Sequence, residues 1–301
     1  MTLNLHELPR LRDSLTYHYI EHAIVDRKQN AIEYIQEAGR TLVPVAAISL
    51  LMLGPGTSLS HAAMKVLMEN GCSLLWVGED GIRCYGQGLG ETRRAYHLLR
   101  QAELVCDHAA RGKVVRRMYN FRFNEELPES LSLAQIRGKE GVRVRETYAK
   151  ASRDYSVPWH GRRYDRSNWG DADTINRTLS AANALLNGIC HAGIVAGGYS
   201  PALGFIHTGR MMSFVYDVAD LYKTELTIPA AFATVAESTA TTEARVRALC
   251  RERFRETRLL QRILSDIDHL LEIPEDVEKS FALDPPSELW TELFSHDRYD
   301  P

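Results

Sequence analysis

The chain has 301 residues, of which 45% are hydrophobic and 25% charged, and its formal net charge at pH 7 is −3. This composition excludes collagenous, mucin-like and wholly disordered proteins, and the length favours two domains. The longest apolar run, residues 42–53, is too short to cross a bilayer, and the N-terminus lacks the apolar stretch of a signal peptide. We therefore expect a cytoplasmic protein without membrane contact.

Residues 1–85 are rich in strand signals and contain one helix. The strand pattern predicts extended segments at 15–25, 31–36, 41–50, 72–77 and 82–85. Ser58 or Ser60 is placed to cap a helix that runs to about Glu69 and ends at Asn70-Gly71. These elements predict a small β-rich, sandwich-like domain.

Beyond residue 90 the strand signal largely stops and helical patterns follow. We expect helices at 91–108, 111–123, 131–154, 173–197, 212–224 and 242–270. The predicted class is α+β with two domains: a β-rich domain (1–85), a glycine-rich linker (86–90), a larger all-α catalytic domain (91–272) and an acidic tail (273–301).

The charges are unevenly distributed along the chain. Residues 91–170 hold 17 Lys and Arg against 10 Asp and Glu, whereas residues 265–301 hold 2 against 11. A basic middle and an acidic tail permit a polyanion-binding face beside a separate acidic arm, although many proteins show similar fluctuations.

A histidine and two aspartates stand close together in the sequence. His207 lies between Gly204 and Gly209, and Asp217 and Asp220 are three residues apart in the helix that follows. Asp217 falls at the margin of the apolar stripe of this helix, where a carboxylate needs a partner such as a divalent cation or an arginine. The set suits Mg²⁺ or Mn²⁺. The alternative is that Asp217 pairs with a core arginine while Asp220 is solvated.

Glu140 is a second candidate, because cations surround it and Gly138 and Gly141 flank it. Glycine inside a helix costs about 1 kcal/mol relative to alanine, so the pair indicates that another backbone or a ligand comes close. The alternative, which we favour on the residues alone, is an exposed salt bridge on the helix surface.

Arginines form a third feature. Five of them recur at intervals of three or four residues and would share one face of a single helix: Arg247, Arg251, Arg255, Arg258 and Arg262. A second basic cluster, interleaved with tyrosines, contains Arg111, Lys113, Arg116, Arg117, Arg122, Arg143, Arg145, Arg162 and Arg163. Both patterns suit phosphate binding, and the first is equally compatible with a solvated face paired to Glu252 and Glu256.

Several of these segments together resemble one family. R-G-K-E-G-V-R-V-R at 137–145, G-F-I-H-T-G at 204–209 and S-F-V-Y-D-V-A-D-L at 213–221 are similar to motifs of the CRISPR-associated spacer-acquisition integrases, the "Cas one" proteins. G-P-G-T-S-L-S-H-A-A at 54–63, W-V-G-E-D-G at 76–81 and G-R-R-Y-D at 161–165 point to the type I-E branch. The likeness covers roughly residues 5 to 265.

The resemblance implies a homodimer that binds prespacer DNA and the CRISPR repeat and assembles with a small ferredoxin-like partner, "Cas two". It implies metal ligands at Glu140, His207 and Asp220, with Asp217 as a further catalytic carboxylate. His22 stands where close relatives place a tyrosine that stacks on the duplex end. We expect further DNA contacts from Arg83, Arg210, Arg245, Arg247, Arg251, Arg255 and Arg258.

The resulting hypothesis is a DNA integrase and endonuclease that depends on Mg²⁺ or Mn²⁺ and inserts prespacers into the array by attack of a 3′-hydroxyl on a phosphodiester. Two alternatives are a structural DNA-binding module, in which the acidic residues merely pair with arginines, and a general repair nuclease for branched DNA.

Overall fold

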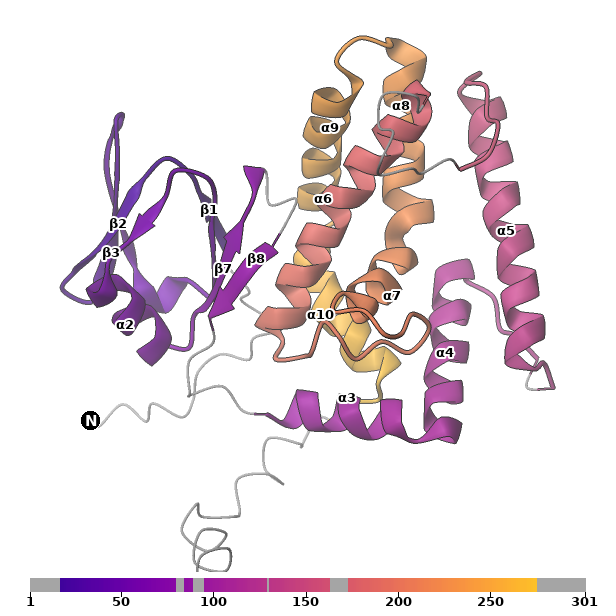
Figure 1. The fold of residues 1–301 in the computed structure, drawn as a ribbon, viewed down its shortest axis with the longest axis horizontal. Coiled ribbons are helices and arrows are strands. Elements are labelled where there is room, and N and C mark those ends of the chain that lie inside the picture. The colour runs from indigo at the N-terminus through magenta and orange to yellow at the C-terminus, as the bar shows by residue number, and fades with distance from the viewer. Residues whose placement is uncertain (1–16, 80–83, 89–94, 129, 163–172, 275–301) are drawn as a thin grey trace, which may run out of the picture.

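The structure, a computed structural model, describes residues 17–79, 84–88, 95–128, 130–162 and 173–274. Strands occur up to residue 88, with one helix among them, and helices follow from residue 96 onward. The two parts lie side by side (Figure 1). The expected α+β class, with a β-rich N-terminal part and a helical C-terminal part, is confirmed.

The strands form two four-stranded sheets within the described residues. The strands are β1 (Tyr17–Ile20), β2 (Ile24–Lys28), β3 (Ala31–Gln36), β4 (Gly39–Pro44), β5 (Leu50–Leu53), β6 (Ser58–Leu59), β7 (Ser73–Val77) and β8 (Cys84–Gly88). The first sheet has the order β1-β5-β7-β8 and the second β4-β3-β2-β6. In the first sheet β1, β5 and β7 run parallel, and β8 is antiparallel to β7.

One apolar cluster joins the two sheets and helix α2 (His61–Glu69). It contains Ile32 from the second sheet, Leu51 and Leu74 from the first, and Leu67 from α2, all buried. The side chain of Ser60 caps α2 by accepting a hydrogen bond from the Ala63 amide at 3.1 Å. This shared core makes the N-terminal part sandwich-like, as predicted.

Two predicted strands are each split into two, and the halves join different sheets. Segment 15–25 becomes β1 and β2 because His22 has φ +50°, a left-handed conformation that interrupts an extended chain. Segment 41–50 becomes β4 and β5, separated by the 3-10 turn Val45–Ala47. Residue pattern alone did not show where the chain crosses from one sheet to the other.

The glycine-rich linker predicted at 86–90 begins inside a strand, which corrects the expectation. Gly86 and Gly88 belong to β8, where they pair with Trp76 and Leu74 of β7. Residues 89–94 and most of the acidic tail, 275–301, lie outside the described residues.

The helical part is built around one central helix. Its helices are α3 (Tyr96–Cys106), α4 (His108–Phe123), α5 (Leu133–Asp154), α6 (Thr174–Ala196), α7 (Ser213–Tyr222), α8 (Ile228–Glu237), α9 (Thr242–Glu256) and α10 (Leu259–Leu270). Helix α6 packs against α7, α8, α9 and α10. By length and apolar composition α6 could cross a membrane, which the sequence analysis did not anticipate, but most of it is buried among the other helices as in a core helix.

Three helix predictions need correction. The predicted helix 242–270 is broken, because Arg258 adopts φ +47° between α9 and α10. The predicted helix 212–224 does not stop: α7 continues through a π-helical turn, Lys223–Thr227, into α8. Helix α8 was not predicted; Pro229 is its second residue, a position in the first turn where proline is well tolerated.

The first sheet docks on the helical part through its outer face. Leu50 and Leu75 of this sheet share a buried apolar cluster with Val195 of α6 and with Leu260 and Leu264 of α10. The sheet therefore supports the C-terminal half of α6, from which the chain continues into the loop that carries His207.

Candidate active site

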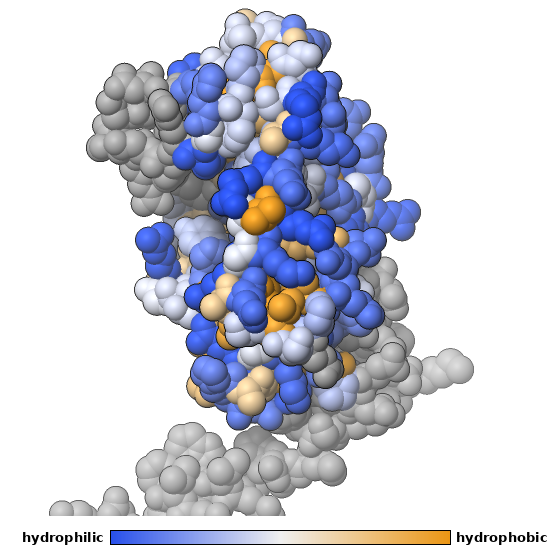
Figure 2. All heavy atoms as spheres, turned by 90° about the vertical axis from the view of Figure 1, so that its right-hand side faces the viewer, coloured by the Kyte–Doolittle hydropathy of each residue, from blue (hydrophilic) through white to orange (hydrophobic). Residues whose placement is uncertain are grey.

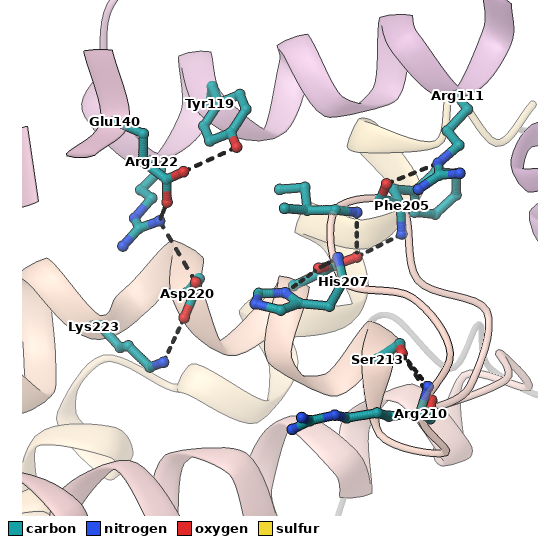
Figure 3. A network of polar contacts seen from close by, with 12 residues as sticks. Arg111, Tyr119, Arg122, Glu140, Phe205, His207, Arg210, Ser213, Asp220 and Lys223 are labelled. Carbon is teal, nitrogen blue, oxygen red and sulfur yellow. Dashed lines mark hydrogen bonds and ion pairs between the residues drawn. The ribbon is translucent and has the colours of Figure 1, made fainter. Parts of the chain in front are cut away.

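Helices α4 and α5 place Glu140 against two donors from α4. The Tyr119 hydroxyl donates to Oε2 of Glu140 at 3.0 Å, and Arg122 Nη1 donates to Oε1 (Figure 3). Tyr119 and Arg122 are three residues apart, so both project from the same side of α4. Glu140 does form a salt bridge, but one that joins two helices and not the exposed surface pair considered from the sequence. Burial raises the pKa of Tyr119, and its contact with Glu140 raises it further.

Asp220 of α7 lies on the other side of Arg122. Its Oδ2 is 3.6 Å from Arg122 Nη1, and its Oδ1 accepts a hydrogen bond from Lys223, which begins the π-helical turn. Burial alone would raise the pKa of Asp220, but the charges of Lys223 and Arg122 outweigh it and lower the pKa. Asp220 is therefore a partly buried carboxylate held ionised by two cations, and not the solvated residue of the alternative considered from the sequence.

Asp217 is fully buried, and among the described residues its partners are backbone amides and His207, not the core arginine of the alternative considered from the sequence. Its Oδ2 accepts hydrogen bonds from the amides of Phe205 and Ile206 at 2.6 and 3.0 Å. Its Oδ1 accepts from the His207 amide at 2.8 Å and from His207 Nδ1 at 2.7 Å. Asp217 thus fixes both the loop and the orientation of the imidazole.

The His207 loop is held at other points as well. The Arg111 Nε donates to the Phe205 carbonyl at 2.9 Å, and the buried Phe205 ring packs on Phe214 of α7. Gly204 has no room for a side chain, because a Cβ there would lie 2.3 Å from the His207 carbonyl oxygen. The turn that precedes α7 is therefore a rigid support for His207.

His207 directs its unbonded ring edge toward Asp220. With Nδ1 occupied by Asp217, Nε2 is the nitrogen left for a ligand, and Figure 3 shows the ring pointing to the Asp220 side. The hydrogen bond with Asp217 raises the pKa of His207, burial opposes the shift, and the charge of Asp220 adds to it. The structure therefore places His207 on the Asp220 side of the site, and Arg122 links Asp220 to Glu140 of α5.

A divalent cation fits this donor set by its chemistry. Two carboxylates and an imidazole are ligands suited to Mg²⁺ or Mn²⁺. Among the residues that the structure describes, no three acidic, histidine or cysteine side chains are already arranged around a common point for a metal. The position between Glu140 and Asp220 instead holds the positive charge of Arg122, so the site is already complementary to a cation.

Gly138 and Gly141 do not contact another described backbone segment. This corrects the first of the two explanations offered for the glycines that flank Glu140, the close approach of another backbone or of a ligand. A Cβ at Gly138 would meet no atom within 4 Å, and one at Gly141 would meet only Arg145 Nη1 at 3.8 Å. The space beside this turn of α5 is open.

Much of the central basic cluster, which the sequence analysis considered as a whole for phosphate binding, makes contacts within the protein. Arg116 donates to the carbonyls of Pro128 and Leu131, and Arg117 to that of Leu270. Tyr119 is buried, and Tyr148 stacks on Trp159 with ring centres 4.5 Å apart. Arg163 and Tyr164 lie outside the described residues.

Other cations remain available on the surface beside the site. The face of the molecule on the α5 side is mostly hydrophilic, with small apolar patches (Figure 2). Helix α5 exposes Arg137, Lys139, Arg145 and Lys150, and of these only Arg145 belonged to the predicted cluster.

The predicted arginine stripe is shorter than expected. Arg247, Arg251 and Arg255 lie on α9, but Arg258 occupies the break and Arg262 lies on α10, where it makes a bidentate pair with Glu225 at 3.0 and 3.1 Å.

The other expected DNA contacts have separate places. Arg210 lies beside the site, in the loop between His207 and α7 (Figure 3). Arg245 pairs with Glu237, and His22 lies in the exposed turn between β1 and β2. Arg83 lies outside the described residues.

Three site residues escaped the sequence analysis as members of the site: Tyr119, Arg122 and Lys223. Arg122 and Tyr119 were assigned to the basic cluster. The one available signal was their spacing of three on α4, which places both on one helix face.

The protein therefore combines a β-sandwich-like domain with a helical domain that carries two carboxylates and a histidine as a candidate active site. The CRISPR associated protein Cas1 family matches residues 121–248, which include all four predicted site residues. The CRISPR-associated endonuclease Cas1 2 of Thermus thermophilus is 53% identical over 292 residues, covering 95% of this chain and 90% of the relative. The CRISPR-associated endonuclease Cas1 of Escherichia coli is 40% identical, covering 95% and 91%. The chain belongs to the Cas1 family.

A solved structure agrees with this assignment. The crystal structure of a TtCas1–DNA complex superposes with a TM-score of 0.80 at 52% identity, covering 89% of this chain and all of that chain.

Proposed function

We propose that this protein is a metal-dependent DNA integrase and endonuclease of CRISPR adaptation, which joins prespacer DNA to the CRISPR array. The observation that carries the proposal is that Glu140 and Asp220, from helices α5 and α7, flank one position of positive charge, with His207 beside it. Membership in the Cas1 family, whose relatives are named endonucleases, supports it.

Glu140, His207 and Asp220 would hold one Mg²⁺ or Mn²⁺. When bound, such an ion polarises a phosphodiester and offsets the negative charge that develops on its oxygens, a contribution of several kcal/mol. The task of Asp217 is to position His207: its hydrogen bond to Nδ1 fixes the tautomer that presents Nε2. We therefore assign Asp217 as a positioning residue and not as a proton acceptor in the reaction.

The proposed reaction exchanges one phosphodiester for another. The 3′-hydroxyl oxygen of the prespacer attacks a phosphorus of the repeat, a new P–O bond forms, and the bond from phosphorus to the 3′-oxygen of the cleaved strand breaks. The attacking hydroxyl loses its proton and the departing 3′-oxygen gains one, so no ATP is consumed. Attack by water at the same position gives hydrolysis, which accounts for nuclease activity at one site.

DNA would be held mainly through phosphates. Exposed cations lie on α5, the helix that carries Glu140, in the His207 loop at Arg210, and on α9. The relative solved as a DNA complex supports DNA binding by this chain. We further propose a homodimer that works with the small ferredoxin-like partner.

The test is an integration assay on a supercoiled plasmid that carries an array, with purified partner, labelled prespacer, and either Mn²⁺ or EDTA. Asp220→Ala and His207→Ala should abolish strand transfer, while duplex affinity measured in EDTA stays within about threefold of the wild type, because neither residue is one of the exposed arginines and lysines. Lys65→Gln, which changes an exposed lysine on helix α2 of the N-terminal part, is the control and should retain transfer.

Two outcomes would favour other functions. Equal loss of transfer and of DNA affinity in both alanine variants would favour a structural DNA-binding module. Efficient cleavage of flaps and junctions without any insertion into the array would favour a repair nuclease.

A further inference from the structure

Each of the four carboxylate oxygens of Glu140 and Asp220 has a hydrogen-bond or ion-pair partner from the protein. Tyr119 occupies Oε2 of Glu140, and Lys223 occupies Oδ1 of Asp220. The two remaining oxygens face a single atom, Nη1 of Arg122, which donates to Oε1 of Glu140 and forms an ion pair with Oδ2 of Asp220 at 3.6 Å. Arg122 is therefore the one described group that contacts both carboxylates, and its departure would free one oxygen on each at the same time.

Arg122 would not leave the two carboxylates unless another anion replaced them as its partner. Its side chain is only 7% exposed, and its Nε is buried without a hydrogen-bond partner. Its guanidinium also lies over the Phe123 ring, 5.3 Å from the ring centre, which gives modest support to the charge. A buried guanidinium that loses both carboxylates would be an uncompensated charge, which is strongly unfavourable. A DNA phosphate oxygen is an anion that it could bind through two N–H groups.

We propose that Arg122 couples metal binding to DNA binding: it occupies the carboxylate pair in the absence of ligands and transfers to a DNA phosphate when a divalent cation takes its place. The inference rests on the proposed function. It means that the free protein binds the metal weakly and that DNA strengthens metal binding, and by thermodynamic linkage the metal strengthens DNA binding by the same factor.

The other two donors cannot play this part. Tyr119 and Lys223 each contact one carboxylate only, through the oxygen that Arg122 does not use. Either can stay in place while a cation binds the second oxygen. Removing Lys223 should therefore change metal affinity without removing its dependence on DNA, and removing Arg122 should remove that dependence.

The experiment measures free Mn²⁺ by its electron paramagnetic resonance signal during titration of the full-length protein. Each titration is repeated with a short duplex whose phosphorothioate linkages resist cleavage, and Mn²⁺ bound by the duplex alone is subtracted. The variants are Arg122→Gln, Arg122→Lys, Lys223→Gln and Glu140→Gln. The matched control is Arg117→Gln, a partly buried arginine of the same helix that pairs with Glu272 away from the site.

In the wild type, DNA should tighten Mn²⁺ binding by roughly tenfold, the size of a typical coupling between two sites. Arg122→Gln should bind Mn²⁺ without DNA about as tightly as the wild type does with DNA, and DNA should change this by less than about twofold. Arg122→Lys, which keeps a charge but loses the planar fork, should fall between them. Arg117→Gln should behave as the wild type, and Lys223→Gln should keep the DNA effect.

Circular dichroism shows whether Arg122→Gln is folded. If it is not folded, the inference is tested by the effect of DNA on the Mn²⁺ affinity of the wild type and of Arg122→Lys. The inference is overturned if DNA leaves wild-type Mn²⁺ affinity unchanged, or if a folded Arg122→Gln or Arg122→Lys variant keeps the full DNA effect. Failure of the proposed function looks different: the wild type would bind no Mn²⁺ with or without DNA, or Glu140→Gln would bind it equally well.

Discussion

Asp217 and His207 form the most fully bonded pair in the site: Oδ1 of the buried aspartate lies 2.7 Å from Nδ1 of the histidine and also accepts the histidine amide at 2.8 Å. One carboxylate thus sets both the backbone and the ring of the same residue. With two further amides on Oδ2, Asp217 balances its burial entirely through hydrogen bonds.

Asp217→Asn should therefore destabilise the protein. The side-chain amide keeps only one acceptor oxygen, and its NH₂ group would face backbone amides that are themselves donors. We expect a loss of about 2–4 kcal/mol in the free energy of unfolding, measured by urea denaturation. Asp107→Asn is the control, because this exposed residue caps α4 and asparagine caps a helix equally well. A loss below 0.5 kcal/mol, on the order of an ordinary surface change, would contradict the role given to Asp217.

His191 of α6 predicts a stability that depends on pH. It is 6% exposed, both ring nitrogens are buried without hydrogen bonds, and burial lowers its pKa to about 4. Between the ordinary histidine pKa, about 6.5, and about 4, the unfolded chain binds a proton that the folded protein does not, so stability falls as the pH falls through this window.

His191→Leu should remove both the unpaired polar atoms and this pH dependence. At pH 7 we expect a gain of about 1–2 kcal/mol in the free energy of unfolding. Below pH 6 the gain should grow by about 1.4 kcal/mol per pH unit. Urea denaturation at about pH 7, 6 and 5 measures both effects. The exposed His108→Leu variant should show neither, and equal gains at all three pH values would refute the assignment.

Two glycine substitutions should act in opposite directions. Gly204→Ala places a Cβ against the His207 carbonyl and against Ser213, so it should displace the loop and lower stability by at least about 2 kcal/mol. Gly138→Ala lies in open space on helix α5 and should raise stability by about 0.5–1 kcal/mol.

Thermal unfolding of the two glycine variants and the wild type measures these shifts. A stabilised Gly138→Ala variant with weakened duplex binding would show that DNA occupies the open space beside α5. A stable Gly204→Ala variant would show that the His207 loop is not fixed as described.

Substitutions of Arg255 and Arg262 distinguish an arginine that contacts DNA phosphate from one that only forms an ion pair within the protein. Arg255 is exposed on α9, whereas Arg262 is paired with Glu225. Arg255→Gln should weaken binding to duplexes of any sequence and reduce the slope of log affinity against log salt by about 0.9, the value for one lost phosphate contact. Arg262→Gln should leave the slope unchanged. Fluorescence anisotropy at four or more salt concentrations measures it, and equal slopes for Arg255→Gln and the wild type would exclude this phosphate contact.

The elements of the fold followed from local patterns where one segment forms one element. Helix α2 and its Ser60 cap, and strand β3, lie where the periodicity predicts them, because capping and alternation act over a few residues. The breaks at His22 and Arg258 were missed, because both residues adopt left-handed backbone conformations that are uncommon for residues other than glycine and cannot be predicted from the residue type.

The sequence by itself supplied the candidate residues: Glu140, His207, Asp217 and Asp220 stand in motifs whose residue types and spacing are fixed along the chain. Only the tertiary structure decided how these groups are used. Burial of Asp217 beneath three amides, and the sharing of Arg122 by Glu140 and Asp220, depend on the packing of α4, α5 and α7. Local sequence sets which donors and acceptors exist, whereas contacts between distant segments set which of them meet.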